Sequence, residues 1–359
     1  MYKVALEILK LLNKNNFEAY IVGGYPRDLY IGKESKDIDI CTSAKYKDLK
    51  KLFKNIKDNK YGSYKLKYKN QQFEITTFRK EKKYINNRFP EKLKYTKRLK
   101  TDLKRRDFTI NTLCIDKNGN FVDYKKAIDD INKGIIKLVG NKKKIKDDSL
   151  RILRAIRFAT VLDFKIDKKL ENAINKYKQY LENLSYDRKK QELEKILKNK
   201  NYKYGLELIK KYELEQYLKI NTDNINYTNN VLGMWAQTII DNSYPFTKDQ
   251  IKRLKVLIEL KEKNFDIYDL YKYGPELLEI VDEIKKENNN IRETYNNLQI
   301  KDRDEIDINF FEISEMIKVT NRMMAEIYDD IEKQIVYNNI KNKKTDIKKY
   351  IKKNYEVSK

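Results

Sequence analysis

The period of the apolar positions changes several times within the first 120 residues. Residues 3–14 space their apolar side chains as one face of a helix, and residues 18–22 follow as a short apolar run that ends at two glycines. Residues 37–40 then alternate cleanly between polar and apolar, residues 73–77 nearly so, and residues 112–116 more loosely. Alternation is typical of strands with one buried face. We therefore expect a mixed α/β segment with a small sheet.

Beyond about residue 125 the strand signals fade and helical spacing dominates. Helices are predicted at 145–162, 167–182, 187–198, 203–217, 229–241, 247–262, 267–285, 309–333 and 344–354. Asn-rich stretches at 221–230 and 286–298 are typical of loops or boundaries. The expected layout is a small α/β head followed by a long all-helical remainder.

Length and charge narrow the class of protein only slightly. The chain has 359 residues, which suits two or three compact domains, and carries 79 Lys and Arg against 54 Asp and Glu. The formal charge of +25 favours an anionic partner such as nucleic acid, because basic side chains release counterions from its phosphates. Lysine and asparagine are abundant along the whole chain, however, so a general compositional bias is an alternative origin of the charge.

Two residue types are more informative because they are absent or rare. The sequence contains no histidine, which excludes histidine general bases, histidine-ligated zinc and a His-Asp phosphohydrolase site. Cys41 and Cys114 have no metal-ligand or redox spacing, so we expect no zinc and a reduced, cytoplasmic setting. No run of about 18 apolar residues and no signal pattern is present, so no membrane partner is expected. Any catalysis must then use carboxylates, Arg, Lys, Tyr or a bound metal.

Asp37 and Asp39 are the first candidates for such chemistry. They are two residues apart in an alternating run, so we expect both carboxylates on one face of a strand. Two such carboxylates can bind two hard divalent ions, with Mg²⁺ the first choice, to activate a hydroxyl and to steady a pyrophosphate leaving group. Glu74 faces away from Phe73 and Ile75 and is a candidate third ligand if the two strands are neighbours. A lone Asp-x-Asp, in contrast, is usually only a solvated strand face.

The glycine turn at Gly23 and Gly24 changes that interpretation. The two glycines end the strand predicted at 18–22 and are followed at once by a predicted helix, which lets backbone amides approach a triphosphate. The segment GGYPRD at 23–28 followed by DID at 37–39 therefore predicts phosphate and metal chemistry at one end of a strand–turn–helix–strand unit.

Ordered motifs over roughly residues 18–200 resemble the tRNA nucleotidyltransferase and bacterial poly(A) polymerase family, in its bacterial and eukaryotic class. The clearest are IVGGYPRDLYIGKESKDIDI at 21–40, LKRRDFTIN at 103–111 and DDSLRILRAIRF at 147–158. A weaker match spans 130–140, and the match at 184–197 is interpreted as a structural brace.

The resemblance implies a fold, a division into domains and a site. The fold would be an α/β nucleotidyltransferase head with a small mixed sheet, followed by an all-α neck, body and tail. The implied domains are a catalytic head at 1–140, a neck for nucleotide selection at 141–200, a body at 201–290 and a tRNA-binding tail at 291–359. The implied nucleotide-binding residues are Gly23, Gly24, Arg27, Arg106, Asp107, Asn111, Asp148, Arg151, Arg154 and Arg157.

Individual roles follow from the matching motifs. Asp37 and Asp39 would hold two Mg²⁺ ions, Arg106 would contact phosphates, and Asp107 would contact the ribose and so select ribonucleotides. Asp148 and Arg151, on the helix predicted at 145–162, would read the base, since a carboxylate accepts from a base amino group and a guanidinium donates to a ring nitrogen or carbonyl. Asp147 stands where a glutamate is more usual. Without the flanking motifs, an ordinary helix ion pair would be the simpler interpretation of Asp148 and Arg151.

Several activities within the family stay open. The stretch at 76–109 has full length and contains Arg79, Tyr84 and Arg88 as flexible-loop residues, which argues against a member that adds only CC. We expect complete, template-independent addition of CCA to the 3′ end of tRNA from CTP and ATP, with release of pyrophosphate. A-only addition and poly(A) synthesis are the alternatives. A non-catalytic RNA-binding protein is less favoured, because both strand carboxylates are present in an otherwise basic chain.

Overall fold

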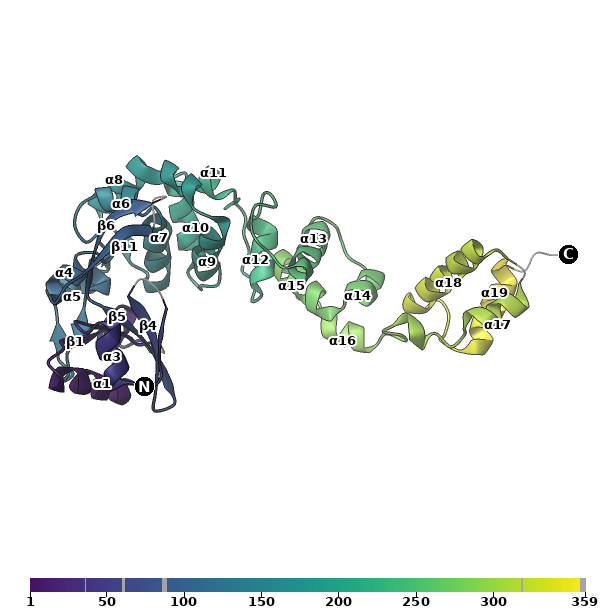
Figure 1. Cartoon of the computed structure of the whole chain (residues 1–359). Helices are drawn as coiled ribbons and strands as arrows, with labels where there is room; N and C mark the ends of the chain where they lie inside the picture. The colour runs from purple at the N-terminus through teal and green to yellow at the C-terminus, as the bar shows by residue number, and fades with distance from the viewer. Residues whose placement is uncertain (36, 60–61, 86–88, 318, 356–359) are drawn as a thin grey trace. The chain divides into compact units, whose positions relative to one another are not determined.

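The chain divides into two compact units. The computed structural model describes residues 1–35, 37–59, 62–85, 89–317 and 319–355, and for residues 81–85 and 89–93 only the backbone. The first unit comprises Met1–Thr222 with Asp241–Pro245, and the second comprises Asp223–Ile240 with Phe246–Lys359. The first unit contains the sheet and the second is helical (Figure 1). The predicted class, an α/β head followed by an all-helical remainder, is confirmed, whereas the domain boundaries at 140, 200 and 290 stay predictions.

A seven-stranded mixed sheet lies in the first unit, in the order β3-β4-β5-β2-β1-β8-β9. Its strands are β1 (Ala19–Val22), β2 (Asp39–Thr42), β3 (Ile56–Asp58), β4 (Ser63–Tyr68), β5 (Gln71–Thr77), β8 (Cys114–Ile115) and β9 (Phe121–Val122). Strands β2 and β5 run parallel, and the other neighbouring pairs with recorded register run antiparallel. All four predicted strands therefore belong to one sheet. Strands β3, β4 and β9 have no counterpart in the sequence prediction.

Helices surround this sheet and continue beyond it. In the first unit they are α1 (Tyr2–Lys14), α2 (Gly24–Tyr30), α3 (Tyr46–Leu52), α4 (Leu99–Leu103), α5 (Ala127–Asn132), α6 (Lys143–Asp147), α7 (Leu150–Leu162), α8 (Lys168–Tyr177), α9 (Tyr186–Leu197), α10 (Tyr202–Lys211) and α11 (Glu215–Leu218), with 3-10 turns η1 (Thr109–Asn111) and η2 (Lys178–Asn183). Outside the large sheet, β6 (Arg79–Ile85) and β7 (Phe89–Tyr95) form a hairpin, and β10 (Ile135–Ile136) and β11 (Lys165–Ile166) form a parallel pair.

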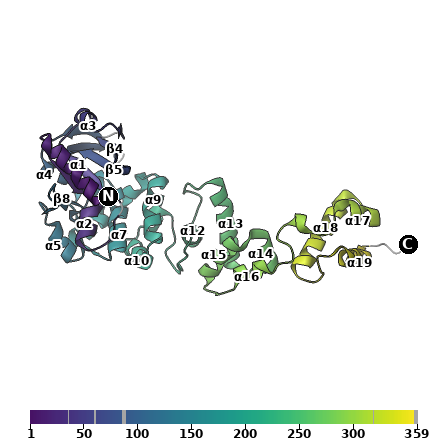
Figure 2. The ribbon, with the colours of Figure 1, turned by 90° about the horizontal axis from the view of Figure 1, so that it is seen from below.

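Helices α1 and α3 cover one face of the sheet (Figures 1 and 2). Ile8 of α1 belongs to the same fully buried cluster as Ile40 of β2 and Ile75 of β5. Because strand side chains alternate, the residues before these two isoleucines, Asp39 and Glu74, point to the opposite face. The apolar core thus fixes which face carries the carboxylates.

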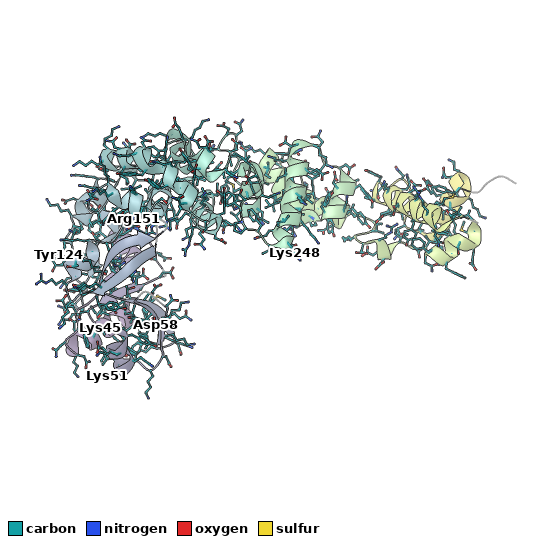
Figure 3. The ribbon with its side chains drawn as sticks, turned by 45° about the horizontal axis from the view of Figure 1, so that its top comes forward. Lys45, Lys51, Asp58, Tyr124, Arg151 and Lys248 are labelled. Atoms are coloured by element: carbon teal, nitrogen blue, oxygen red, sulfur yellow. The ribbon has the colours of Figure 1, made fainter. Side chains whose placement is uncertain are left out.

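Helix α7 lies in another part of the first unit. Figure 3 shows Arg151 of α7 well separated from Lys45 and Lys51 at α3. The helix predicted at 145–162 is interrupted, because α6 ends at Asp147 and α7 begins at Leu150. Asp148 between them has extended backbone angles, with φ −145° and ψ 92°, so the prediction that it is helical is wrong.

The second unit consists of helices. They are α12 (Val231–Thr238), α13 (Lys248–Glu262), α14 (Ile267–Tyr273), α15 (Pro275–Lys285), α16 (Ile291–Asn296), α17 (Phe310–Met316), α18 (Asn321–Val336) and α19 (Lys344–Tyr355), with a 3-10 turn at η3 (Arg303–Glu305). The helix predicted at 267–285 is divided at Gly274, which has φ +77° and precedes Pro275. The helix predicted at 309–333 is divided after α17, and α16 lies in a stretch predicted as loop. None of the helices in the described ranges has the length and apolar composition that a membrane crossing requires.

Candidate active site

The glycine turn lies directly against a carboxylate. Gly23 follows β1 with φ +90°, a conformation that favours glycine, and a β-carbon at this position would lie 3.0 Å from Oδ2 of Asp39. Val22, the last residue of β1, is paired with Asp39 on β2. The turn therefore brings backbone next to the Asp39 carboxylate and leaves no room for a side chain.

Asp39 and Glu74 are opposite each other on the parallel strands β2 and β5. The condition on which Glu74 was a candidate, that the two strands are neighbours, is met. Strand β2 begins at Asp39, however, so the prediction that Asp37 belongs to the strand is wrong. Asp37 nevertheless lines the same cavity as Asp39 and Glu74. The Asp39 side chain reaches solvent in this cavity, yet the protein around it removes much of its hydration. This burial, then Glu74 and more weakly Asp37, raise the pKa of Asp39 to about 6, although the positive charge of Arg106 opposes them.

These carboxylates suit a hard divalent cation. Carboxylate oxygens are ligands that Mg²⁺ prefers, and a cation would relieve the repulsion that raises the pKa of Asp39. Ser63 donates a hydrogen bond of 2.5 Å to Oε1 of Glu74. Within the described ranges no group of three carboxylates has the geometry of a complete metal site. The residues present therefore fit a cation held by Asp37 and Asp39, with Glu74 beside it.

Asp102 of α4 is fully buried and holds the two arginines that follow it. Its carboxylate accepts a hydrogen bond of 2.8 Å from Nε of Arg105 and lies 3.5 Å from Nη2 of Arg106. Burial alone would raise the pKa of Asp102, but the two guanidinium groups outweigh it and lower the pKa. Nε of Arg106 is buried and has no hydrogen-bond partner among the residues that the structure describes. The positive charge of Arg106 also lowers the pKa of Asp39, so this buried donor belongs to the electrostatic environment of the carboxylates.

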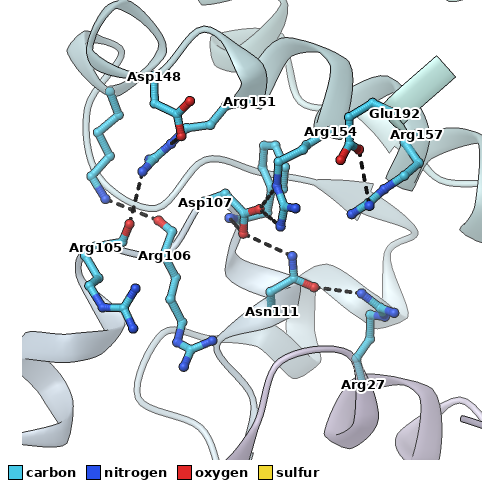
Figure 4. Close-up of polar contacts among 12 residues, drawn as sticks. Arg27, Arg105, Arg106, Asp107, Asn111, Asp148, Arg151, Arg154, Arg157 and Glu192 are labelled. Carbon is cyan, nitrogen blue, oxygen red and sulfur yellow. Dashed lines mark hydrogen bonds and ion pairs between the residues drawn. The ribbon is translucent and has the colours of Figure 1, made fainter. Parts of the chain in front are cut away.

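Asp107 connects η1 to α7 (Figure 4). Its Oδ1 accepts a hydrogen bond of 3.0 Å from Asn111, and its Oδ2 accepts one of 2.7 Å from Nε of Arg154. Asn111 in turn accepts a hydrogen bond of 2.7 Å from Nη1 of Arg27. Burial alone would raise the pKa of Asp107, but Arg154, the Asn111 amide and Arg151 outweigh it and hold the pKa well below its usual range.

Phe158 of α7 supports three guanidinium groups. The centroid of its ring lies 4.2 Å from Arg157, 5.2 Å from Arg27 and 5.4 Å from Arg154. Arg157 also lies 3.2 Å from Oε2 of Glu192 on α9 (Figure 4). The structure thus gives Arg157 a carboxylate partner of its own, and a contact of Arg157 with nucleotide stays a prediction.

Asp148 and Arg151 form an ion pair with hydrogen-bonding capacity left over. Oδ2 of Asp148 lies 3.3 Å from Nε of Arg151, and Nη2 of Arg151 donates a hydrogen bond of 3.1 Å to the carbonyl of Arg105 (Figure 4). Oδ1 of Asp148 and Nη1 of Arg151 are buried, and neither has a hydrogen-bond partner in the part of the chain that the structure describes. A buried polar atom without a partner costs about 1–3 kcal/mol, so this pair favours a ligand with a complementary donor and acceptor. Asp147, in contrast, is exposed at the end of α6.

The predicted flexible-loop residues fall on the β6–β7 hairpin or outside the described residues. Arg79 begins β6, and its backbone N–H donates a hydrogen bond of 3.1 Å to Asp102. Tyr84 is paired with Pro90 across the hairpin. Arg88 lies outside the described residues. The base of the hairpin is therefore attached to the same carboxylate that holds Arg106.

The structure brings the other predicted residues together in two groups, and the charge of Arg106 acts on Asp39 in the first of them. One group is the glycine turn with the three carboxylates, and the other is the network around Asp107 and the Asp148–Arg151 pair. The sequence analysis identified no role for Asp102 or Phe158. A signal for Asp102 exists, since an acidic residue three and four positions before two arginines is a typical helix ion-pair spacing. No comparable signal marks Phe158.

Three family models match consecutive parts of the chain. The poly(A) polymerase head domain matches residues 19–137. A model described as "Probable RNA and SrmB- binding site of polymerase A" matches residues 163–223, and tRNA nucleotidyltransferase domain 2 matches residues 241–351.

Curated relatives are similar to the chain along nearly its whole length. The CCA-adding enzyme of Ligilactobacillus salivarius is 32% identical over 380 residues, which cover 96% of this chain and 94% of the relative. The CCA-adding enzyme of Lactococcus lactis subsp. cremoris is 32% identical over 391 residues, which cover 99% of this chain and 97% of the relative.

Solved structures share the fold. The Bacillus stearothermophilus CCA-adding enzyme in complex with CTP has a TM-score of 0.84 at 24% identity and covers 99% of this chain and 98% of its own. The Thermotoga maritima CCA-adding enzyme complexed with tRNA has a TM-score of 0.68 at 20% identity, with 97% and 94% covered.

Proposed function

The chain belongs to the CCA-adding enzyme family of tRNA nucleotidyltransferases, and on that premise we propose that it adds CCA to the 3′ end of tRNA from CTP and ATP and releases pyrophosphate. The observation in this structure that carries the proposal is a pair of buried atoms, Oδ1 of Asp148 and Nη1 of Arg151, that have no hydrogen-bond partner among the described residues. They lie in the same compact unit as the carboxylates Asp37 and Asp39.

One acceptor and one donor match cytosine and adenine, the two bases that this reaction must distinguish from uracil and guanine. Cytosine and adenine each present an amino group beside an unprotonated ring nitrogen, so Asp148 accepts from the amino group and Arg151 donates to the ring nitrogen. Uracil and guanine present a carbonyl oxygen and a ring N–H in the corresponding places, which sets acceptor against acceptor and donor against donor. Protein groups therefore select the nucleotide, and no nucleic-acid template is needed.

The rest of the nucleotide would lie between the two groups of residues. Arg106, whose Nε has no hydrogen-bond partner among the described residues, would contact the phosphates, together with the backbone at Gly23 and Gly24. Asp107 would contact the ribose, and Arg154 and Asn111 hold its carboxylate in place for that contact.

The transfer itself needs a hydroxyl, a phosphorus and a leaving group. The 3′-hydroxyl of tRNA loses its proton to solvent and attacks the α-phosphorus. The bond from that phosphorus to the oxygen bridging the β-phosphate breaks, and pyrophosphate leaves with the electron pair of that bond. Asp37 and Asp39 would hold Mg²⁺, expected as two ions, which polarises phosphoryl oxygens and neutralises charge on the attacking and leaving oxygens. The basic side chains of the helical part would bind tRNA through its phosphates and its shape.

The test uses purified protein, Mg²⁺ and three tRNAs that end before CCA, after C and after CC, each with CTP, ATP or both. Extension of all three to CCA, followed by a stop, is the expected result, and Asp37→Ala and Asp39→Ala variants should add nothing. Addition of one A to the CC-ended tRNA alone would instead identify an A-adding enzyme. Long A tracts would identify a poly(A) polymerase, and no incorporation by the unmodified protein would refute the proposal.

A further inference from the structure

A row of charged side chains crosses the face of the sheet opposite α1 and α3, beside the carboxylates. Asp39 on β2 is paired with Glu74 on β5. Glu74 is paired with Lys65 on β4, and Lys65 is paired with Lys57 on β3. Directly opposed residues of neighbouring strands share a face, so these four side chains point to the side that α1 and α3 leave uncovered. The row changes sign between β5 and β4.

Lys67 extends this row along β4. It is two residues from Lys65 and therefore on the same face, at a distance of about 7 Å along the strand. All three lysines line a cavity of about 920 Å³ that also contains Asp39 and Glu74. Their side chains are exposed, and none has an ion pair or side-chain hydrogen bond within the described ranges. The cavity thus holds three lysines, with no ion pair among the described residues, next to the candidate metal ligands.

The geometry of the proposed reaction indicates which part of the substrates lies over these lysines. A β-carbon at Gly23, which follows β1, would lie 3.0 Å from Oδ2 of Asp39, and the charge of Arg106, in the segment before β8, acts on Asp39. The proposed triphosphate site is therefore on the β1 side of β2. In an in-line displacement the attacking and leaving oxygens are on opposite sides of the phosphorus. The attacking 3′-hydroxyl must therefore approach from the β5 side, past Glu74. The strand that carries this hydroxyl then lies over β4 and β3.

We propose that Lys57, Lys65 and Lys67 form a subsite for the sugar-phosphate backbone of the single-stranded 3′ end of the tRNA, which they hold in line with the reacting nucleotide. The inference rests on the proposed function. Lysine is a point charge on a flexible stem and tolerates the small shifts of a strand that grows by successive nucleotides. Contacts with phosphates do not depend on the base sequence. The subsite can therefore bind the tRNA end before CCA, after C and after CC.

The experiment compares two triple variants that remove the same charge. The site variant is Lys57→Ala, Lys65→Ala, Lys67→Ala. The control variant is Lys10→Ala, Lys47→Ala, Lys51→Ala, whose lysines are exposed on α1 and α3, against the other face of the sheet (Figure 3 labels Lys51). Thermal unfolding verifies that both fold, and a single Lys65→Gln variant serves if the site triple is unstable.

Addition of A to CC-ended tRNA gives KM for tRNA and for ATP, and filter binding gives the Kd of tRNA over a range of salt concentrations. For the site variant we expect KM and Kd for tRNA to rise about tenfold or more and the salt slope to fall by about 2, since each single-strand phosphate contact contributes about 0.7. KM for ATP should change less than about twofold, because the triphosphate is on the other side of the carboxylates. A tRNA trimmed back to its last base pair should bind the site and control variants equally.

Three outcomes would overturn the subsite. Equal weakening by both variants would mean a general effect of charge, and a higher KM for ATP alone would place the nucleotide triphosphate on these lysines. Unchanged tRNA binding and KM in the site variant would show that the lysines are only solvated. Failure of the unmodified protein to extend any tRNA would refute the proposed function itself, whereas normal extension with an unaffected site variant would refute only the subsite.

Discussion

Replacing Asp148 with asparagine is the sharpest test of how the base is read. The two side chains have the same shape, so the Asp148→Asn carbonyl can keep the bond to Nε of Arg151 that Oδ2 makes at 3.3 Å. The amide NH₂ then takes the place of Oδ1, the buried atom without a partner among the described residues. A donor now faces the amino group of cytosine or adenine where an acceptor stood before.

The size of the effect follows from the contact that is lost. A hydrogen bond to a charged group contributes about 1.5–3 kcal/mol, so kcat/KM for CTP and ATP should fall roughly 10- to 150-fold. Uracil and guanine present a carbonyl oxygen at the same place, to which the new NH₂ can donate. Discrimination of CTP over UTP and of ATP over GTP should therefore fall by at least the same factor.

The assay measures single additions of each of the four nucleotides, with tRNA ending before CCA for CTP and UTP and CC-ended tRNA for ATP and GTP. Asp147→Asn makes the same chemical change at the exposed neighbouring residue and should alter kcat/KM less than about twofold. An equal loss for all four nucleotides, or an unchanged ratio of CTP to UTP, would refute base reading by Asp148.

Three further predictions concern the network, the turn and the metal. Asp107→Asn leaves Arg154 without its buried carboxylate and should lower the free energy of unfolding at pH 7 by about 3–5 kcal/mol in urea denaturation. Because folding lowers the pKa of Asp107, its contribution to the free energy of unfolding is complete above the unfolded pKa of about 4 and is lost as the pH falls towards the folded pKa. A difference in stability between the unmodified protein and Asp107→Asn that grows below pH ~4 would contradict the assignment. Gly23→Ala and Gly32→Ala both place a side chain at a positive φ, and each should lower the free energy of unfolding by about 1–3 kcal/mol in thermal unfolding. Only Gly23→Ala should also lower kcat, because its β-carbon would press on Asp39, whereas nothing lies within 4 Å of a β-carbon at Gly32. Asp39→Asn or removal of divalent ions with a chelator should lower kcat by about a thousandfold or more while ATP binding remains measurable, and activity that survives chelation would exclude the metal role.

The part of the candidate site that contains the glycine turn and the carboxylates could be predicted from sequence because short-range rules determine it. A strand that ends in two glycines and a second strand with alternating acids fix the turn, the facing of the carboxylates and their neighbourhood within 20 residues of chain. Alternation predicts the ends of β2 less accurately, because the alternating pattern includes Asp37 whereas pairing with β1 begins at Asp39. The prediction that Glu74 is a candidate third ligand depended on one long-range assumption, that two separate strands are neighbours. The parallel pairing of β2 with β5 confirms this assumption.

The Asp148–Arg151 pair shows why the rest of the candidate site could not be predicted from local sequence pattern. The apolar spacing from 145 to 162 is that of one continuous helix, on which Asp148 and Arg151 would be an ordinary exposed ion pair of small effect. In the structure the helix breaks at Asp148 and Ser149, and Oγ of Ser149 donates a hydrogen bond of 2.9 Å to the carbonyl of Tyr180, which is 31 residues away. A rule based on neighbouring residues cannot predict a hydrogen-bond partner so distant in the sequence. The break places the Asp148–Arg151 pair in a buried position, where one acceptor and one donor have no partner among the described residues. The proposed selection of a base therefore depends on a departure from the local pattern.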